Sequence, residues 1–326
     1  MTSVLVTGAN GQIGTDLVAA LRARHGAERV IASDLAPEPP ADVADRGPYA
    51  RLDVTDEARL REILDRHGVD TVYHLASLLS ATGEQRPELC WEVNLLGLRN
   101  VLEAARQRGL RVFWPSSIAV FGPATPRAET PQTTLLDPRT MYGVTKVSGE
   151  LLCRYYAERL DVDVRSVRFP GIVSYTAPPG GGTTDYAVAI FYGALQEGRY
   201  VCFVRPETRL PMMYMPDALR AVLGVMDAPA GAITIRTSYN LTAMSFSAEE
   251  LAAEIRRRVP GFEVVYEPDY RQQIAESWPA TIDDTRARED WGWSPRFDLA
   301  AMVEDMLVHL PRQLAARGER AGPLHR

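Results

Sequence analysis

The chain has 326 residues, of which 46% are hydrophobic and 24% are charged, and its formal net charge is -6. This composition is typical of a globular protein with one large core or two domains, and the negative charge argues against nucleic acid as a partner. Three scattered cysteines and five histidines without ligand spacing predict neither a disulfide framework nor a metal site. Because no apolar run approaches about 18 residues and no signal peptide is visible, we expect a cytoplasmic protein without a membrane partner.

The first half of the chain alternates short β-branched runs with helical patterns. Strands are predicted at 3–7, 29–33, 50–52, 71–75, 111–115 and 163–168, and helices at 12–25, 56–66, 91–108 and 142–160. A loop is predicted at 36–47, where three prolines stand. This alternation predicts an α/β fold, a doubly wound parallel sheet of the Rossmann type with helices on both faces.

The second half of the chain is less regular. A stretch rich in proline and glycine after residue 168 predicts a long loop. Helices are predicted at 186–197, 218–226 (capped by Asp217), 248–259 and 299–314, and strands at 200–204, 212–215, 233–235 and 262–266. We therefore expect two domains, residues 1–170 and residues 171–326, the second a smaller α/β domain that is partly interleaved with the first.

Three glycines stand where the first predicted strand gives way to the first predicted helix. Gly8, Gly11 and Gly14 allow a tight turn, a close backbone approach and a close contact between helix and strand. Gln12 and Ile13 lie in the same turn and begin the helix. The free N–H groups and the positive dipole end of that helix would bind a pyrophosphate, so residues 1–170 are predicted to hold a dinucleotide.

The residues after the second and third strands indicate that this dinucleotide is NAD. Asp34 lies 20 residues beyond Gly14 (34 − 14), where a carboxylate accepts hydrogen bonds from ribose hydroxyls. It would repel the 2′-phosphate of NADP, and Leu35 adds no compensating charge. Asp53 and Val54 end the third strand, where Asp53 could bind the adenine amine or, alternatively, cap the following helix.

Tyr142 and Lys146 are four residues apart on a predicted helix and therefore share one face. Of the 36 basic residues, Lys146 is the only lysine, so the other 35 are arginines. An ammonium about 4 Å from a phenolate is worth about 4 kcal/mol at an effective dielectric near 20. That corresponds to roughly 3 pKa units, enough to bring a tyrosine towards neutrality and make it a general base. The larger head group of arginine would not reproduce this point charge.

Two serines close the strand at 111–115. Ser116 and Ser117 are expected to direct their hydroxyls at the same cleft, where one could donate to a substrate oxygen. The alternative is a buried serine with a structural role.

These motifs resemble the extended short-chain dehydrogenases/reductases, the epimerase-like family, over nearly the whole chain. The resemblance is carried by Thr7–Gly14, His74–Ser77, Asn94, Ser117 and Tyr142–Lys146. Four later segments resemble more narrowly the branch of L-threonine 3-dehydrogenases, namely 169–174, 179–187, 238–246 and 276–284.

The resemblance implies that NAD oxidises the 3-hydroxyl of L-threonine to 2-amino-3-ketobutyrate without a metal ion. It assigns Tyr142 as the base and Ser117, often threonine in the family, as the residue that orients the hydroxyl. Lys146 would lower the tyrosine pKa and hold the nicotinamide ribose. Further cofactor contacts are implied at Leu75, Ala76, Asn94, Pro170 and Ile172.

The candidates for binding threonine itself are Ser80, Gly181, Gly182, Thr183, Thr184 and Trp278. Glycine N–H groups and threonine hydroxyls suit a carboxylate, and Trp278 could cover the cavity. Without the resemblance, the same residues are interpreted as a glycine-rich turn, a helix cap at Thr184 and a core tryptophan.

In related enzymes two helices of each subunit form a four-helix dimer interface, so a homodimer is expected. Apolar residues suited to it are Leu95, Leu98, Leu102, Ala105, Leu151, Leu152 and Tyr155. The alternative is that these side chains pack within one chain.

Two other functions are considered. One is a nucleotide-sugar epimerase or dehydratase on the same scaffold, although Ile118 and Ala119 stand where dehydratases use an Asp-Glu pair. The other is an NAD-sensing regulatory protein, which would have no need of Ser117, Tyr142 and Lys146.

Overall fold

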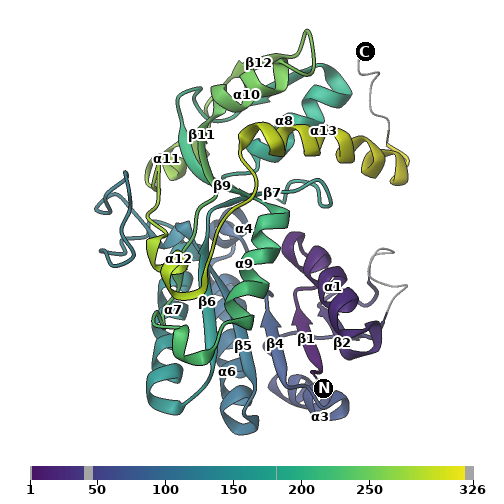
Figure 1. The fold of residues 1–326 in the computed structure, drawn as a ribbon, viewed down its shortest axis with the longest axis vertical. Coiled ribbons are helices and arrows are strands. Elements are labelled where there is room, and N and C mark those ends of the chain that lie inside the picture. The colour runs from purple at the N-terminus through teal and green to yellow at the C-terminus, as the bar shows by residue number, and fades with distance from the viewer. Residues whose placement is uncertain (1, 40–46, 181, 320–326) are drawn as a thin grey trace.

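A computed structural model describes residues 2–39, 47–180 and 182–319. Its centre is a parallel seven-stranded sheet in the order β10-β6-β5-β4-β1-β2-β3, with helices on both faces (Figure 1). The strands are β1 (Val4–Thr7), β2 (Val30–Asp34), β3 (Tyr49–Arg51), β4 (Thr71–His74), β5 (Arg111–Ser117), β6 (Val164–Phe169) and β10 (Tyr239–Asn240). The predicted doubly wound parallel sheet is confirmed, while most of the predicted loop at 36–47 lies outside the described residues.

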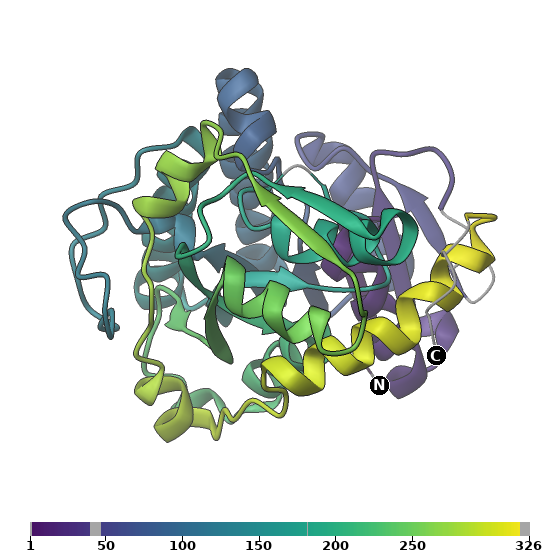
Figure 2. The ribbon, with the colours of Figure 1, turned by 90° about the horizontal axis from the view of Figure 1, so that it is seen from above.

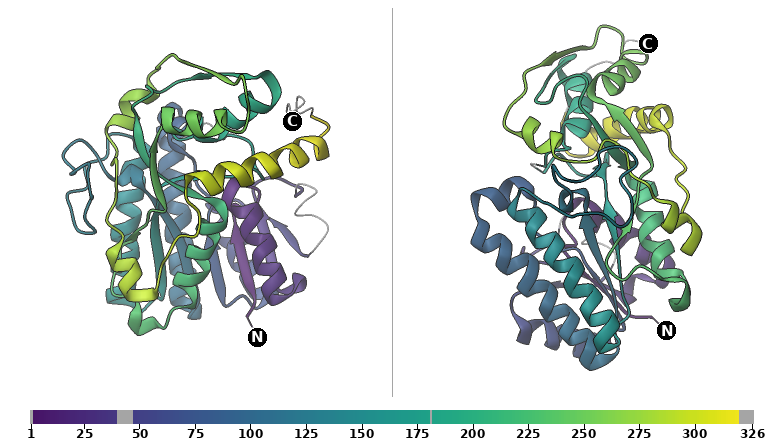
Figure 3. Two further views of the ribbon diagram at one scale, coloured as in Figure 1. Left: turned by 45° about the horizontal axis from the view of Figure 1, so that its top comes forward. Right: turned by 90° about the vertical axis from the view of Figure 1, so that its left-hand side faces the viewer.

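The two faces of the sheet follow from the alternation of side chains along each strand. Val4 and Val6 of β1 belong to the core beneath α1 and α9, whereas Leu5 faces α3, α6 and α7. Figure 3 shows these two helical layers on either side of the sheet. The helices around the sheet are α1 (Gln12–His25), α3 (Glu57–His67), α4 (Ser80–Gln85), α5 (Pro87–Trp91), α6 (Gly97–Arg108), α7 (Met141–Leu160) and α9 (Met215–Asp227).

The remaining elements build a second layer above the carboxyl ends of the strands. It contains a three-stranded sheet in the order β11-β9-β7 and a parallel pair of β8 and β12. Seen from above, the long helix α13 runs along this layer beside α10 (Figure 2). The elements are β7 (Gly171–Val173), α8 (Tyr186–Tyr192), β8 (Arg199–Cys202), β9 (Arg209–Tyr214), β11 (Met244–Ser247), α10 (Ala248–Arg256), β12 (Glu263–Tyr266), α11 (Arg271–Glu276), α12 (Thr285–Trp291) and α13 (Leu299–Ala316).

Two local predictions are wrong. Residues 233–235 form no strand, because the N–H groups of Thr234 and Ile235 donate to the Tyr239 hydroxyl instead of a ladder. Asp217 does not cap a helix that starts at residue 218, because α9 begins at Met215. Its buried carboxylate accepts hydrogen bonds from the backbone N–H groups of residues 296 and 297.

The expected division at residue 170 is crossed by two elements. Helix α9 packs on α1, and strand β10 pairs with β6, so residues 215–227 and 239–240 complete the first layer. We keep two interleaved domains as a proposal. Within the described part of the chain, no helix is both long and apolar enough to cross a membrane.

Candidate active site

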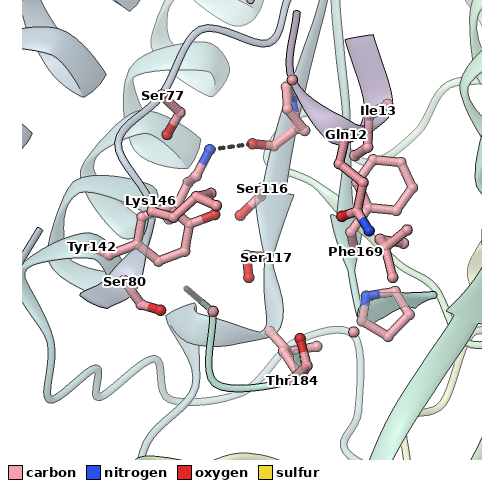
Figure 4. A pocket seen from close by; sticks show the side chains of 18 of the residues that line it. Gln12, Ile13, Ser77, Ser80, Ser116, Ser117, Tyr142, Lys146, Phe169 and Thr184 are labelled. Carbon is pink, nitrogen blue, oxygen red and sulfur yellow. Dashed lines mark hydrogen bonds between the residues drawn. The ribbon is translucent and has the colours of Figure 1, made fainter. Parts of the chain in front are cut away.

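A cavity of about 250 Å³ lies at the carboxyl ends of β1, β4, β5 and β6, between the two layers. This edge of a parallel sheet is where ligands bind in doubly wound folds. Of the predicted site residues, the cavity brings together Gly8, Gly11, Gln12, Ile13, Gly14, Leu75, Ser80, Ser117, Tyr142, Lys146, Pro170, Ile172, Gly182, Thr183, Thr184 and Trp278 (Figure 4). Its lining does not include Asp34, Leu35, Asp53, Val54, Ala76 or Asn94.

The glycine turn has the geometry of a pyrophosphate cradle. Gly8 adopts φ +69, and a Cβ added there would lie 2.6 Å from Ala76 N. A Cβ on Gly14 would overlap the Gly8 carbonyl oxygen and lie 2.8 Å from Ala9 Cα. Helix α1 starts after Gly11 with no side-chain cap and no acidic residue in its first turn. Its first N–H groups therefore lack a side-chain acceptor, and the residues present fit a dinucleotide phosphate.

The carboxylate of Asp34 is held in place by two backbone N–H groups. Asn10 N donates to Oδ2 at 3.0 Å and Leu35 N donates to Oδ1 at 2.8 Å. A guanidinium that the sequence reasoning left out stands close by, because Arg51 Nε donates to the Leu35 carbonyl at 3.2 Å. A guanidinium can pair with a 2′-phosphate, so the prediction of NAD rather than NADP rests on the Asp34 carboxylate.

Two other predicted cofactor residues make contacts within the protein. Asp53 is exposed and accepts from Thr55 N and Thr55 Oγ1, while Asp56 caps α3, so the alternative that Asp53 is the cap is wrong. Asn94 lies in a π-helical turn, Glu92–Leu96, and its amide is engaged by Leu78 and the Thr145 hydroxyl. Such turns frequently mark functional sites. Here the turn fastens the loop after β4 to α7.

The three predicted catalytic side chains converge on the cavity (Figure 4). Helix α7 begins at Met141, and Lys146 Nζ reaches across to donate to the Pro115 carbonyl at 2.7 Å. The same ammonium lies 5.3 Å from the centre of the Tyr142 ring. Ser117 lines the cavity at the end of β5.

Ser116 also lines the cavity, but its hydroxyl is already engaged in a hydrogen bond. Its hydroxyl donates to the buried carboxylate of Glu150 at 2.6 Å. Of the two candidate serines, Ser117 is therefore the one with a hydroxyl placed for substrate, and Ser116 fits the structural alternative.

The electrostatic expectation for Tyr142 requires correction. Burial raises the pKa of Tyr142 to about 12, only partly offset by a hydrogen bond with Ser117. Burial also lowers the pKa of Lys146 to about 7. The sequence argument counted the attraction between the two charges and omitted the cost of placing both groups away from water. In the protein alone, the tyrosine is a phenol at neutral pH.

The loop before α8 differs in detail from its prediction. Gly182 N donates to Asp185 Oδ2 at 2.8 Å, and Asp185, not Thr184, is the N-cap residue of α8. Trp278 belongs to the core and also lines the cavity, so the core interpretation is confirmed and its role in covering a substrate stays a prediction. The predicted contact at Gly181 lies outside the described residues.

Asp185 is the residue that sequence reasoning missed. Among the described residues that line the cavity it is the only carboxylate. The signal was present, because Asp185 directly follows the threonine pair in the quoted segment 179–187. Across the described ranges, no cluster of histidine, cysteine or acidic residues could hold a metal ion.

Comparison with known proteins places the chain in a family. Residues 4–241 match the NAD dependent epimerase/dehydratase family, and the chain belongs to it. An uncharacterised epimerase/dehydratase of Staphylococcus haemolyticus is 47% identical over 308 residues, which cover 94% of this chain and 97% of that one.

Solved structures narrow the resemblance. The holo form of the GalE-like L-threonine dehydrogenase from Cupriavidus necator superposes with a TM-score of 0.92 at 52% identity, covering 94% of this chain and 99% of that chain. A monomeric L-threonine 3-dehydrogenase from a metagenome gives a TM-score of 0.91 at 50% identity, covering 95% and 99%. The family and these neighbours support an NAD-dependent oxidoreductase.

Proposed function

We propose that the protein is an L-threonine 3-dehydrogenase that uses NAD to convert L-threonine into 2-amino-3-ketobutyrate. The observation that carries this proposal is that one cavity is lined by Tyr142, Ser117 and Lys146 together with the glycine turn and Asp185. The similarity to threonine dehydrogenases of known structure supports it. The side chains proposed to meet the substrate are short and polar, namely Ser80, Ser117, Thr183, Thr184 and Asp185, which suits a small polar substrate.

The hydroxyl end of the substrate is handled by Tyr142 and Ser117. Ser117 donates a hydrogen bond to the oxygen on C3, and Tyr142 as phenolate takes the hydroxyl proton. NAD, held on the glycine turn, would accept the hydride from C3. Lys146, anchored on the Pro115 carbonyl, would donate to the nicotinamide ribose.

The pKa of about 12 gives this step a direction with pH. Oxidation needs the phenolate, whose population grows as the pH rises towards that pKa. Threonine oxidation is therefore expected to accelerate from neutral to alkaline pH. The reverse reaction needs the phenol, which predominates below that pKa, so its rate is expected to change little between neutral and moderately alkaline pH.

The ammonium and the carboxylate of threonine each find a suitable partner in the cavity. Its ammonium suits the Asp185 carboxylate, which already accepts from Gly182 N. Its carboxylate suits the hydroxyls of Ser80, Thr183 and Thr184, all of which line the cavity. Of the two glycine N–H groups expected in that role, that of Gly182 donates to Asp185, and Gly181 lies outside the described residues.

We also propose a homodimer through α6 and α7. Leu98, Leu102 and Ala105 are buried in the chain's own core, so for them the intrachain alternative holds. Between Pro87 and Leu160, the large apolar side chains that are exposed on helical segments are Trp91, Leu96, Val144, Leu151 and Tyr155. They lie on α7 and on the segment leading into α6, two neighbouring elements.

One experiment tests the activity. NADH formation is measured with L-threonine, L-serine, D-threonine and a UDP-sugar, together with NAD binding by the wild type and by Tyr142→Phe. We expect NADH from L-threonine, and in Tyr142→Phe almost no turnover with NAD binding retained. Folded, NAD-binding wild type that makes no NADH from L-threonine would refute the proposal. Conversion of the UDP-sugar would favour the epimerase, and NAD binding without any turnover would favour the sensor.

A further inference from the structure

A buried ion pair lies behind the catalytic side chains. The side chain of Glu150 on α7 is fully buried and that of Arg168 on β6 is 4% exposed. Arg168 Nε and Nη2 donate to the two carboxylate oxygens of Glu150 at 2.8 and 2.7 Å. The Ser116 hydroxyl donates to the same carboxylate. None of these three contacts is required by the proposed proton transfer.

Glu150 continues the row of residues that carries the chemistry. Tyr142, Lys146 and Glu150 are spaced by four residues and therefore lie on one face of α7. Each of them meets the end of β5. Tyr142 interacts with Ser117, and Lys146 donates to the Pro115 carbonyl (Figure 4). Glu150 accepts a hydrogen bond from the Ser116 hydroxyl.

The guanidinium nitrogen of Arg168 that does not contact Glu150 extends the hydrogen-bond network towards the second layer. Its Nη1 donates to the Gln132 carbonyl at 3.0 Å and to Asn240 Oδ1 at 2.9 Å. Asn240 Nδ2 in turn donates to the carbonyls of Thr130 and Asp283. The carboxylate of Glu150 thus links the catalytic helix to β5 and β6 and, through Arg168 and β10, to the segments around residues 130 and 283.

We propose that Glu150 is a positioning residue for the reaction: by holding Ser116 and Arg168 it sets the rotation and depth of α7, and so the place of Tyr142 and Lys146 relative to Ser117. Stability alone does not call for these charges, because a buried ion pair can often be replaced by apolar groups without loss. A displacement of about 1 Å at a reacting group can cost roughly 100-fold in rate. The role in catalysis rests on the proposed function, whereas the role in geometry does not.

The test compares Glu150→Gln with Asp217→Asn, which removes another fully buried carboxylate that does not line the cavity. Both variants are expected to unfold at lower temperature than the wild type. Only Glu150→Gln should lower kcat for threonine oxidation by about 10-fold or more, with KM changed less. Ser116→Ala keeps the ion pair and removes only the hydrogen bond from Ser116 to Glu150, so it should also lower kcat. It replaces Glu150→Gln in the test if that variant fails to fold.

A second readout needs neither NAD nor threonine. The ultraviolet titration of Tyr142, obtained by subtracting each variant's Tyr142→Phe counterpart, should move in Glu150→Gln and Ser116→Ala and stay in place in Asp217→Asn. The proposal is overturned if Glu150→Gln and Ser116→Ala fold and have the same kcat as the wild type. It is also overturned if Tyr142 titrates in them with the same midpoint as in the wild type. If the wild type does not oxidise threonine, the proposed function fails, and the titration alone decides about Glu150.

Discussion

Replacing Lys146 with methionine should change how the stability of the protein depends on pH. Burial lowers the pKa of Lys146 from 10.5 to about 7. Below about pH 7 the amine is protonated in both the folded and the unfolded chain. Between pH 7 and 10.5 the folded chain has released a proton that the unfolded chain still binds, so the free energy of unfolding of the wild type rises with pH.

The size of this effect follows from the pKa gap. One pKa unit corresponds to about 1.4 kcal/mol, so the slope should approach about 1.4 kcal/mol per pH unit in the middle of the interval. Over the whole gap it accumulates to roughly 5 kcal/mol. Lys146 is only 2% exposed, so solvent screening removes little of it. Because the chain has no other lysine, no second lysine side chain contributes.

The measurement is denaturant unfolding of the wild type and of Lys146→Met at pH 7, 8 and 9, without NAD. The methionine variant loses the contact with the Pro115 carbonyl, so the slope of the stability difference with pH is the quantity to compare, not its value at one pH. Arg154→Met, which removes an exposed cation from the same helix, should leave the difference flat. A flat difference for Lys146→Met, or a wild type that loses stability relative to it as the pH rises, would refute the reasoning.

Three further substitutions test other parts of the site. Gly14→Ala places a Cβ against the Gly8 carbonyl and should cost about 1–3 kcal/mol of stability and most of the NAD affinity by calorimetry, whereas Gly231→Ala, which meets nothing within 4 Å, should change neither. Asp185→Asn retains an acceptor for Gly182 but lacks the charge, so KM for L-threonine should rise by about 10-fold or more while NAD binding is unchanged; an unaltered KM would remove Asp185 from the substrate site. Leu151→Glu places a charge on an exposed apolar face and should halve the mass seen by sedimentation, and a wild type that is already monomeric would contradict the dimer.

The sequence predicted those parts of the fold and site that depend on short-range patterns. Helix α1 lies at the predicted residues 12–25, because its start follows from the glycine turn and its length from the apolar period. The convergence of Tyr142, Lys146 and Ser117 followed from helix spacing and from the shared edge of a parallel sheet.

The parts that the sequence did not predict depend on partners distant in the chain. Asp217 looked like a helix cap because its partners at 296 and 297 are about eighty positions away. Residues 233–235 have β-branched side chains but bond to the Tyr239 hydroxyl. The pKa of Tyr142 depends on burial, which spacing along a helix does not reveal.

Strand β10 has a consequence for dissecting this protein. A fragment ending at residue 170 would lose the pairing of β10 with Val167 and Arg168 and leave β6 as the edge strand of the sheet, with its buried side chains uncovered. The same truncation would remove Asn240, which accepts a hydrogen bond from Arg168, and helix α9, which packs on α1. During synthesis, the first sheet is therefore complete only after the chain has passed residue 240, and the nucleotide-binding half is expected to be insoluble when expressed alone.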